Sequence, residues 1–366
     1  MKILFFIDGL RKGGKERRFI ELLKILEKNQ IDFIIVMIHK NIQYEIDTSL
    51  LNKIVFLNKK RKKDISPFVE FYKISKKYKP DFIHTWSSMV TFYSIFSVLF
   101  LRINLVNSQI TNAPPLLNVF SFLWLISKIN FFFSKKIISN SYAGLNAYNV
   151  KGNKGVVIYN GVHMDRFIIN RPIDYIKNHF NINTKYCIAM VASFSDSKDY
   201  SMFFGLAEYY NVKNPDITFL AIGDGLFFKH FKDLKNNKSI DNIIMTGNVN
   251  NVEEILKICD IGILISNNIN HGEGISNSII EYMASNLPVL ANDSGGTKEI
   301  LLNGYNGFLI EENIYENFIK YIDLLLSDEK NRNIMAMNAY NTISKSFNID
   351  IMFKSYMNIY KSLLEQ

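Results

Sequence analysis

Two acidic residues, Glu273 and Glu281, lie eight positions apart in the segment HGEGISNSIIEYMASNLPVLA at 271–291. Glu273 precedes a glycine in a loop, and Glu281 falls on the first two turns of the helix that we expect next. Acids placed in this way can bind hydroxyl groups at two different parts of one elongated ligand. The helix N-terminus between them offers backbone N–H groups to an anion. A ligand with hydroxyls at both ends and a diphosphate between them is a nucleotide-sugar.

Two further segments carry groups suited to a phosphate. In GLRKGGKE (9–16), Gly13 and Gly14 let a phosphate approach the backbone closely, although a simple tight turn is the alternative. The segment is not G-x-G-x-x-G, so a nicotinamide fingerprint is not supported. In VASFSDSKD (191–199), Lys198 lies near the start of an expected helix, where a cation can meet a phosphate.

Other polar groups end expected strands, and their interpretation is open. GDG (223–225) is better explained as a sharp turn than as a site. The backbone of GNV (247–249) could meet the edge of a base, or could simply turn the chain. His84 ends the strand DFIHTW and could bind the hydroxyls of an acceptor, although a core histidine with satisfied hydrogen bonds is equally expected. His271 is open in the same way.

A site that holds a diphosphate through Mg²⁺ or Mn²⁺ needs clustered carboxylates. No Asp-x-Asp occurs in the chain, so we expect no divalent metal and no cofactor. The phosphate charge would then be balanced by Lys198, by amides of the glycine loop and by the helix dipole.

The elements that must position these residues alternate along the chain. In the first half we expect strands at 2–8, 31–39, 54–57, 81–86, 104–109, 135–141 and 155–162, and helices at 15–29, 67–78, 88–101 and 116–133. In the second half we expect strands at 186–193, 217–225, 243–247, 260–266, 288–293 and 307–310, with helices at 199–210, 251–258, 276–285 and from there to the end. Such alternation predicts an α/β fold with two doubly wound parallel sheets, joined near 162–185. Ligands bind at the carboxyl ends of such strands, so we expect the site in the cleft between the two domains.

The segment 116–133, LLNVFSFLWLISKINFFF, is nearly long and apolar enough to span a membrane. Lys128 and Asn130 interrupt it, and it stands where a crossover helix between two strands is required. We therefore predict a helix that is part core and part interfacial rather than one that spans a membrane.

Charge is unevenly spread over the 366 residues. Residues 1–170 hold 26 Lys and Arg against 11 Asp and Glu, and the remainder hold 17 against 23. A basic first half indicates an anionic surface as partner. Its densest run, KKRKK at 59–63, is either a solvated loop or a lipid contact worth about 1 kcal/mol per basic residue. Cys187 and Cys259 both stand in apolar runs, which excludes a disulfide scaffold and fits a reducing cytoplasm.

Several of these segments together resemble a known family. They are GGKE (13–16), NGVHMDRF (160–167), Lys198, GDG (223–225), EGISNSIIE (273–281) and SGGTKEI (294–300). The combination resembles the family 4 retaining glycosyltransferases, which have the GT-B fold of two Rossmann-like domains facing a central cleft. The resemblance covers nearly the whole chain and is most specific in the two-glutamate block. It implies an acceptor-binding domain over 1–165, a donor-binding domain over 166–349 and a last helix, 350–366, that packs back on the first domain.

The resemblance also implies roles for individual residues. Glu273 and Lys198 would be catalytic, with Glu273 on the hydroxyls of the donor sugar and Glu281 on the ribose. The donor-binding set would be Gly13, Gly14, Lys198, Asn248, Val249, Glu273, Gly274, Ile275, Ser276, Asn277 and Glu281. His84 and Thr111 are our candidates for binding the acceptor.

The chain departs from the family pattern at two places. Many members carry an arginine a few residues before the lysine, where this chain has Ser193. Many also carry a histidine or arginine after the strand near 105–113, where this chain offers Gln109, Thr111 and Asn112. Lys198 would therefore act with less help, and no proton relay can be carried over from relatives.

The implied function is a metal-independent retaining hexosyltransferase. It would take a nucleoside-diphosphate sugar, in the first instance a UDP-sugar, and extend a surface polysaccharide or lipid-linked glycan. It would be cytoplasmic and peripheral on the inner face of the cell membrane, held through the basic N-terminal domain. The alternative is a catalytically weak sugar-nucleotide or glycan-binding partner on the same scaffold. We expect no nucleic-acid partner, because no basic motif interleaved with aromatic residues is present.

Overall fold

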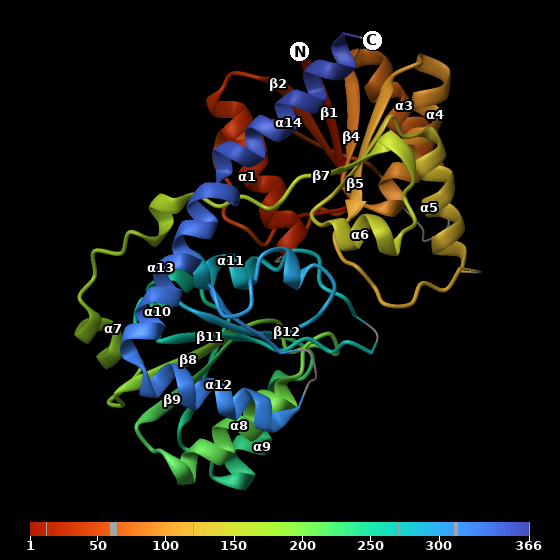
Figure 1. Cartoon of the computed structure of the whole chain (residues 1–366). Coiled ribbons are helices and arrows are strands. Elements are labelled where there is room, and N and C mark those ends of the chain that lie inside the picture. The colour runs from red at the N-terminus through yellow and green to blue at the C-terminus, as the bar shows by residue number, and fades with distance from the viewer. Residues whose placement is uncertain (12, 59–63, 120, 270, 311–313, 366) are drawn as a thin grey trace. The chain divides into compact units, whose positions relative to one another are not determined.

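The computed structural model describes the chain except Lys12, 59–63, Phe120, Asn270, 311–313 and Gln366. The basic run at 59–63 therefore lies outside the described residues. The chain divides into two compact units, one comprising Met1–Gly161 and Ile349–Gln366 and the other Val162–Asn348 (Figure 1). The chain thus leaves the first unit slightly before residue 165, where we expected the boundary, and returns to it with its last helix.

The first unit is built on a seven-stranded sheet in the order β3-β2-β1-β4-β5-β6-β7. The strands are β1 Lys2–Ile7, β2 Asp32–Met37, β3 Ile54–Phe56, β4 Phe82–Thr85, β5 Asn104–Ile110, β6 Lys136–Ser139 and β7 Gly155–Val157. The helices are α1 Gly14–Lys28, α2 Thr48–Leu51, α3 Ser66–Tyr78, α4 Ser88–Leu101, α5 Phe122–Phe133, α6 Tyr142–Ala147 and α14 Ile349–Leu364, with a 3₁₀ turn at Gly152–Lys154. Its paired strands are parallel, as the alternation of strands and helices predicted.

Both faces of this sheet are covered, which explains why β1 reads as a continuous apolar run. Phe5 packs edge-on against Phe19 of α1, with ring centroids 5.4 Å apart, in the same core as α14. Phe6 points to the opposite face and stacks on Phe71 of α3 at 4.3 Å. Figure 1 shows α1 and α14 on one side of the strands and α3, α4 and α5 on the other.

The helix expected over 116–133 is shorter in the structure, where α5 begins at Phe122. Ser121 is its N-cap, and its Oγ accepts a hydrogen bond of 3.2 Å from the backbone N–H of Trp124. The N-cap signal of this serine was overlooked within the apolar run. Asn130 is fully buried, while Phe132 is exposed, so α5 is part core and part surface. Among the described residues, no helix has the length and apolar character needed to cross a membrane.

The second unit is built on a six-stranded sheet in the order β10-β9-β8-β11-β12-β13. The strands are β8 Tyr186–Val191, β9 Ile217–Ile222, β10 Ile243–Gly247, β11 Ile261–Leu264, β12 Val289–Asn292 and β13 Gly307–Ile310. The helices are α7 Ile173–His179, α8 Tyr200–Lys213, α9 Phe228–Lys238, α10 Val252–Leu256, α11 Asn277–Ala284, α12 Tyr315–Ser327 and α13 Glu329–Ser346, with 3₁₀ turns at Met164–Phe167 and Thr297–Glu299. Helices α7 and α9 were not expected from the sequence. Cys187 and Cys259 are free and buried, as their apolar surroundings predicted.

Helix α11 is fixed tightly to this sheet through Tyr282. A side-chain carbon added at Gly262 of β11 would lie only 2.3 Å from the Tyr282 ring, so the helix lies against the strand where only glycine fits. The Tyr282 hydroxyl donates to the carbonyl of Ile263 at 3.0 Å and accepts from the N–H of Val191 at 2.5 Å. The neighbouring residue, Glu281, is thereby held in a defined place.

Candidate active site

The candidate site lies at the carboxyl edge of the sheet in the second unit. Strands β8, β11 and β12 are neighbours and run parallel. Lys198 follows β8, Glu273 follows β11 and Ser294 follows β12. Because the carboxyl ends of parallel strands meet at one edge, three segments far apart in the sequence deliver their side chains to one place.

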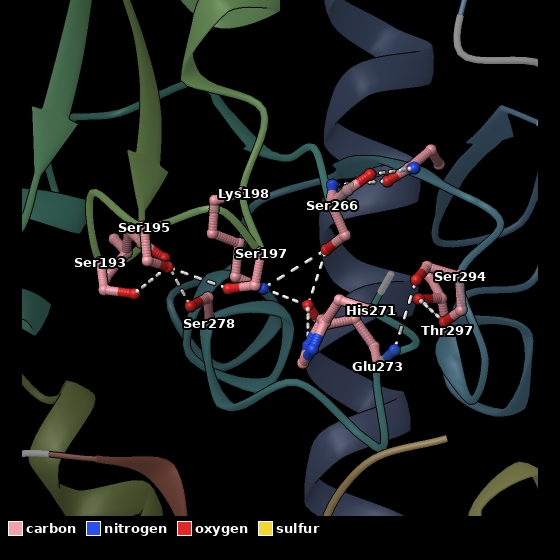
Figure 2. A network of polar contacts seen from close by, with 12 residues as sticks. Ser193, Ser195, Ser197, Lys198, Ser266, His271, Glu273, Ser278, Ser294 and Thr297 are labelled. Carbon is pink, nitrogen blue, oxygen red and sulfur yellow. Dashed lines mark hydrogen bonds and ion pairs between the residues drawn. The ribbon is translucent and has the colours of Figure 1, made fainter. Parts of the chain in front are cut away.

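Lys198 and Glu273 form a direct ion pair, shown in Figure 2. The Lys198 Nζ donates to Glu273 Oε1, and Ser266 Oγ donates to the same oxygen at 2.6 Å. The Nε2 atom of His271 lies 3.5 Å from that oxygen. The sequence placed the lysine and the acid at separate strand ends, and the structure brings them into contact.

Glu273 is buried and ionised. Burial alone would raise the pKa of its carboxyl, but the Lys198 cation, together with hydrogen bonds from His271 and Ser266, lowers that pKa well below its ordinary value. The contacts that the described residues make with this carboxylate fall on Oε1. One oxygen is therefore held in position, while Oε2 is left to accept hydrogen bonds from a ligand.

The backbone around Glu273 is anchored to the turn after β12. The N–H of Glu273 donates to Ser294 Oγ at 3.3 Å, and the N–H of Gly296 donates to the carbonyl of Glu273 at 2.8 Å. Asn292 joins the ends of β11 and β12, because its side-chain amide makes two hydrogen bonds of 2.8 Å with the backbone of Ser266. These contacts give the SGGTKEI segment a physical role as the support of the Glu273 loop.

The loop that carries Lys198 is joined to the end of β11. Lys198 and Ser266 form an isolated antiparallel bridge, and hydrogen bonds link the backbone of 197–199 to that of 265–267. The direction of the Lys198 side chain toward Glu273 is thus set by backbone pairing rather than by the side chains alone.

A chain of hydroxyl groups stands before Lys198. Ser193, Ser195 and Ser197 are linked through their Oγ atoms at 3.0 and 2.9 Å (Figure 2). Ser193 occupies about the place where many members of the family that the sequence resembles have an arginine. This segment thus offers hydroxyl donors in place of a guanidinium.

The second acid, Glu281, lies on the second turn of α11 and is buried. The helix begins at Asn277 after the N-cap Ser276, one residue later than the sequence predicted, so its positive end lies between the two acids in the chain. Gly274, Ile275 and Ser276 are buried beside it. The guanidinium of Arg166 lies 4.0 Å from Glu281 Oε1.

The residues expected near a base follow β10. Asn248 is exposed, and its Nδ2 lies 3.5 Å from Asp224 Oδ2, while Val249 is half-buried. The GDG segment is the sharp turn that we preferred. Gly223 has a φ of +139°, and a side-chain carbon there would lie 2.1 Å from the carbonyl oxygen of Ala192.

Gly13 and Gly14 belong to the first unit and open α1. The N–H of Gly13 donates to the hydroxyl of Tyr44 at 3.1 Å, and that hydroxyl donates to the carbonyl of Gly13 at 2.8 Å. The Gly13 N–H therefore has a protein partner, and a phosphate would have to displace Tyr44 to use it. Gly14 is exposed at the helix start.

His84 is a core residue, and our expectation that it contacts an acceptor is wrong. It lies inside β4, is fully buried, and its ring nitrogens are 2.8 Å from the hydroxyl of Tyr360 and 2.7 Å from that of Ser108. Burial and the Arg18 cation lower the pKa of His84 well below its ordinary value, so the ring is neutral. Thr111, the other acceptor candidate, follows β5 and is half-buried.

Sequence reasoning missed Ser266, Asn292 and Ser294 as parts of the site. A signal was available, because each is a polar residue at or just beyond the carboxyl end of an expected buried strand. His271, which the sequence left open, lies beside Glu273. Among the described residues, no group of three or more His, Cys, Asp or Glu side chains could hold a metal ion.

Comparison with known proteins places these features in context. Residues 173–342 match the family model described as glycosyl transferases group 1. An Escherichia coli protein, UDP-Gal:alpha-D-GlcNAc-diphosphoundecaprenol alpha-1,3-galactosyltransferase, is 26% identical over 322 residues, which cover 78% of this chain and 76% of the relative. The Staphylococcus aureus capsular polysaccharide biosynthesis glycosyltransferase CapM is 24% identical over 261 residues, covering 67% of this chain and 66% of CapM.

The fold has close counterparts among solved structures. Anabaena HepE, in a crystal structure with UDP, superposes with a TM-score of 0.83 at 17% identity and covers 99% of this chain and 100% of its own. At this level of identity the likeness shows the fold alone, and the aligned residues include those of both units.

Proposed function

We propose that this chain, a group 1 glycosyltransferase of the GT-B fold, moves a hexosyl unit from a UDP-sugar to a lipid-linked or polysaccharide acceptor with retention of the anomeric configuration. The observation that carries the proposal is the ion pair of Lys198 and Glu273, with one oxygen of the acid left for a ligand. The relatives from E. coli and S. aureus are named for reactions that build lipid-linked and capsular glycans.

In the proposed donor complex, each charged group has one task. Glu273 accepts hydrogen bonds from hydroxyls of the sugar, and Glu281 accepts them from the ribose. Lys198 and the N-terminus of α11 stabilise the diphosphate, whose negative charge grows as the bond to the sugar breaks. With these groups in place we further propose that the reaction needs no divalent metal and that Asn248 and Val249 lie beside the base.

Retention itself is proposed from the family that the sequence resembles, and the state of Glu273 bears on the route by which it would occur. A carboxylate that is ion-paired to Lys198, with its pKa held well below the ordinary range, is a poor candidate for a covalent nucleophile. We therefore propose that the acceptor attacks on the face from which UDP departs, with UDP leaving as the new bond forms. The enzyme contributes positioning and stabilisation of the leaving group.

A binding protein without activity is the weaker alternative. It would not need a buried lysine–glutamate pair at a strand edge, since two desolvated charges are costly to assemble without a further purpose. The relatives described above are also named as enzymes.

The proposal is tested by screening UDP- and other nucleotide-sugars for thermal stabilisation of the purified protein. A donor at about 100 times its Kd should raise the free energy of unfolding by about 2.7 kcal/mol. The stabilising donor is then turned over with a lipid-linked acceptor in the presence of EDTA, and NMR reads the anomeric configuration of the product. Stabilisation by several UDP-sugars without any turnover would support the binding protein instead, and an inverted product would exclude retention.

We also propose that the first unit binds the anionic surface of a membrane. Along α4, α5 and the segment between them, the exposed apolar side chains of the described residues include Leu99, Phe100, Leu116, Phe122, Leu123, Leu125 and Phe132. Lys154 lies at the end of α5, with its Nζ bonded to the carbonyls of Phe131 and Phe132. An apolar face bordered by basic residues fits the boundary between lipid headgroups and acyl chains.

Flotation with vesicles tests this surface. The wild-type protein should float with anionic vesicles and less with neutral ones. The variant Phe122→Glu/Phe132→Glu should remain at the bottom of the gradient while retaining its thermal stabilisation by the donor. Equal flotation with both lipids, or unchanged flotation of the variant, would contradict the assignment.

A further inference from the structure

Apart from the approach of Arg166 to Glu281, the segment NGVHMDRF at 160–167 has no role in the site described so far. The second unit begins at Val162, within this segment. Its residues 162–171 lie along α10, and we call them the strap. Arg166 Nη2 lies 3.3 Å from Glu253 Oε2, and Arg171 Nη1 lies 2.7 Å from Glu254 Oε2. Lys257, just after α10, donates from its Nζ to two strap carbonyls at 2.6 and 3.0 Å. Three basic side chains thus hold the strap on this helix.

One of these contacts reaches the candidate donor site. The guanidinium of Arg166 stands between two carboxylates, Glu253 on α10 and Glu281 on α11. Relative exposure is 21% for the Arg166 side chain, 13% for Glu253 and 5% for Glu281. The most buried member of the three is the acid that we assign to the ribose, and Arg166 supplies it with a countercharge.

The two distances decide what the arginine does. At 3.3 Å, Arg166 is within hydrogen-bonding reach of Glu253. At 4.0 Å it is too far from Glu281 Oε1 for a hydrogen bond, yet close enough for strong Coulomb attraction. Arg166 is therefore hydrogen-bonded to Glu253, and it acts on the charge of Glu281 through space without a hydrogen bond to Oε1.

We propose that Arg166 is a positioning residue that supplies the countercharge of the Glu281 carboxylate and so orients this side chain to accept hydrogen bonds from the ribose hydroxyls. This inference rests on the proposed function, since it requires that Glu281 binds ribose. A buried carboxylate with a fixed countercharge is a stronger acceptor for hydroxyl groups than a neutral carboxyl group. The strap is then what fixes the countercharge, and the 160–167 motif acquires a role in donor binding.

The test compares two ligands that differ only in the ribose hydroxyls, UDP and 2′,3′-dideoxy-UDP. Calorimetry gives the ratio of their dissociation constants for the wild-type protein and for the variants Glu281→Gln, Arg166→Gln, Arg166→Lys and Arg171→Gln. Arg171 is the matched control, because it also binds a glutamate of α10. Its side chain is 57% exposed, and among the described residues its ion pair is with Glu254 and not with Glu281. A general loss of structure in the strap would weaken both ligands alike and leave the ratio unchanged.

We expect the wild-type protein to prefer UDP and Glu281→Gln to lose most of that preference. Arg166→Gln should reduce the preference by about tenfold, the effect of weakening one charge-assisted hydrogen bond. Arg166→Lys should retain part of it, because the charge remains but the planar fork held by Glu253 is lost. Arg171→Gln should keep the wild-type ratio.

Two results would overturn the inference, and they are distinguishable. If Glu281→Gln loses the preference while Arg166→Gln and Arg166→Lys keep it, Arg166 does not act on Glu281, and the ribose assignment stands. If Glu281→Gln itself keeps the wild-type ratio, the ribose assignment fails and the role of Arg166 fails with it. Should Arg166→Gln not fold, the Arg166→Lys arm decides, with a ratio equal to that of the wild-type protein counting against the proposal.

Discussion

Replacing Glu273 by glutamine changes one charge at the centre of the candidate site and little of its shape. The Oε1 position can still accept from Ser266, but Lys198 loses its anionic partner. Lys198 and Glu273 are only 12% and 10% exposed. Removing one member of a buried pair costs about 3–5 kcal/mol of stability, since a buried charge is left uncompensated.

The effect on catalysis follows from the free oxygen. A carboxylate accepts charge-assisted hydrogen bonds from hydroxyl groups. Each such bond stabilises the complex by roughly 1–2 kcal/mol more than a bond between neutral groups. With two such bonds to the donor sugar, the loss is roughly 2–4 kcal/mol, so Glu273→Gln should lower kcat/KM by about 30- to 900-fold at 1.36 kcal/mol for each factor of ten.

The assay is the initial rate of UDP release in the presence of acceptor, with thermal melting of each variant alongside. Glu208→Gln is the control, because Glu208 forms an exposed pair with Lys238, and such pairs contribute little to stability. A Glu273→Gln variant that is folded and turns over at near the wild-type rate would refute the assignment.

Other consequences follow from the same structure. Because the pKa of Glu273 is lower in the folded than in the unfolded protein, its contribution to stability is present above about pH 4.5 and is lost as the pH falls below it; urea titrations should show this acid dependence reduced in Glu273→Gln. His84 is neutral when folded, so the free energy of unfolding should fall by up to about 1.4 kcal/mol per pH unit below its ordinary pKa of 6.5, and His84→Gln should reduce that slope. Gly262→Ala should lose about 1–3 kcal/mol in urea unfolding, because the added carbon meets the Tyr282 ring, and an unchanged midpoint would contradict the close packing of α11.

The sequence predicted the architecture well because both sheets are buried on two faces. Short apolar runs between helical patterns, such as the one around β1, have few other interpretations. The errors fall where local signals compete. The Ser121 cap makes α5 begin later than the apolar run, and in α9 the apolar stripe of Phe228, Phe231 and Leu234 is short and set among charged residues.

The residues of the candidate site can be named from the sequence, but their contacts cannot. The pattern locates the strand ends, and Lys198 and Glu273 are candidates on that ground. Their ion pair depends on strand order, β8 beside β11, which links residues 75 positions apart and leaves no periodic trace in the sequence. His84 shows the converse, because a histidine one residue before the end of β4 reads like a histidine at the strand tip, and only its partners Tyr360 and Ser108 assign it to the core.

The central claim is that Glu273 binds the sugar of the donor, and calorimetry with two ligands tests it most directly. The wild-type protein and Glu273→Gln are each titrated with UDP and with the UDP-sugar found in the donor screen. The account predicts that Glu273→Gln loses about tenfold or more of its affinity for the UDP-sugar while its affinity for UDP changes far less. Equal losses for the two ligands, or no loss for the UDP-sugar, would contradict it.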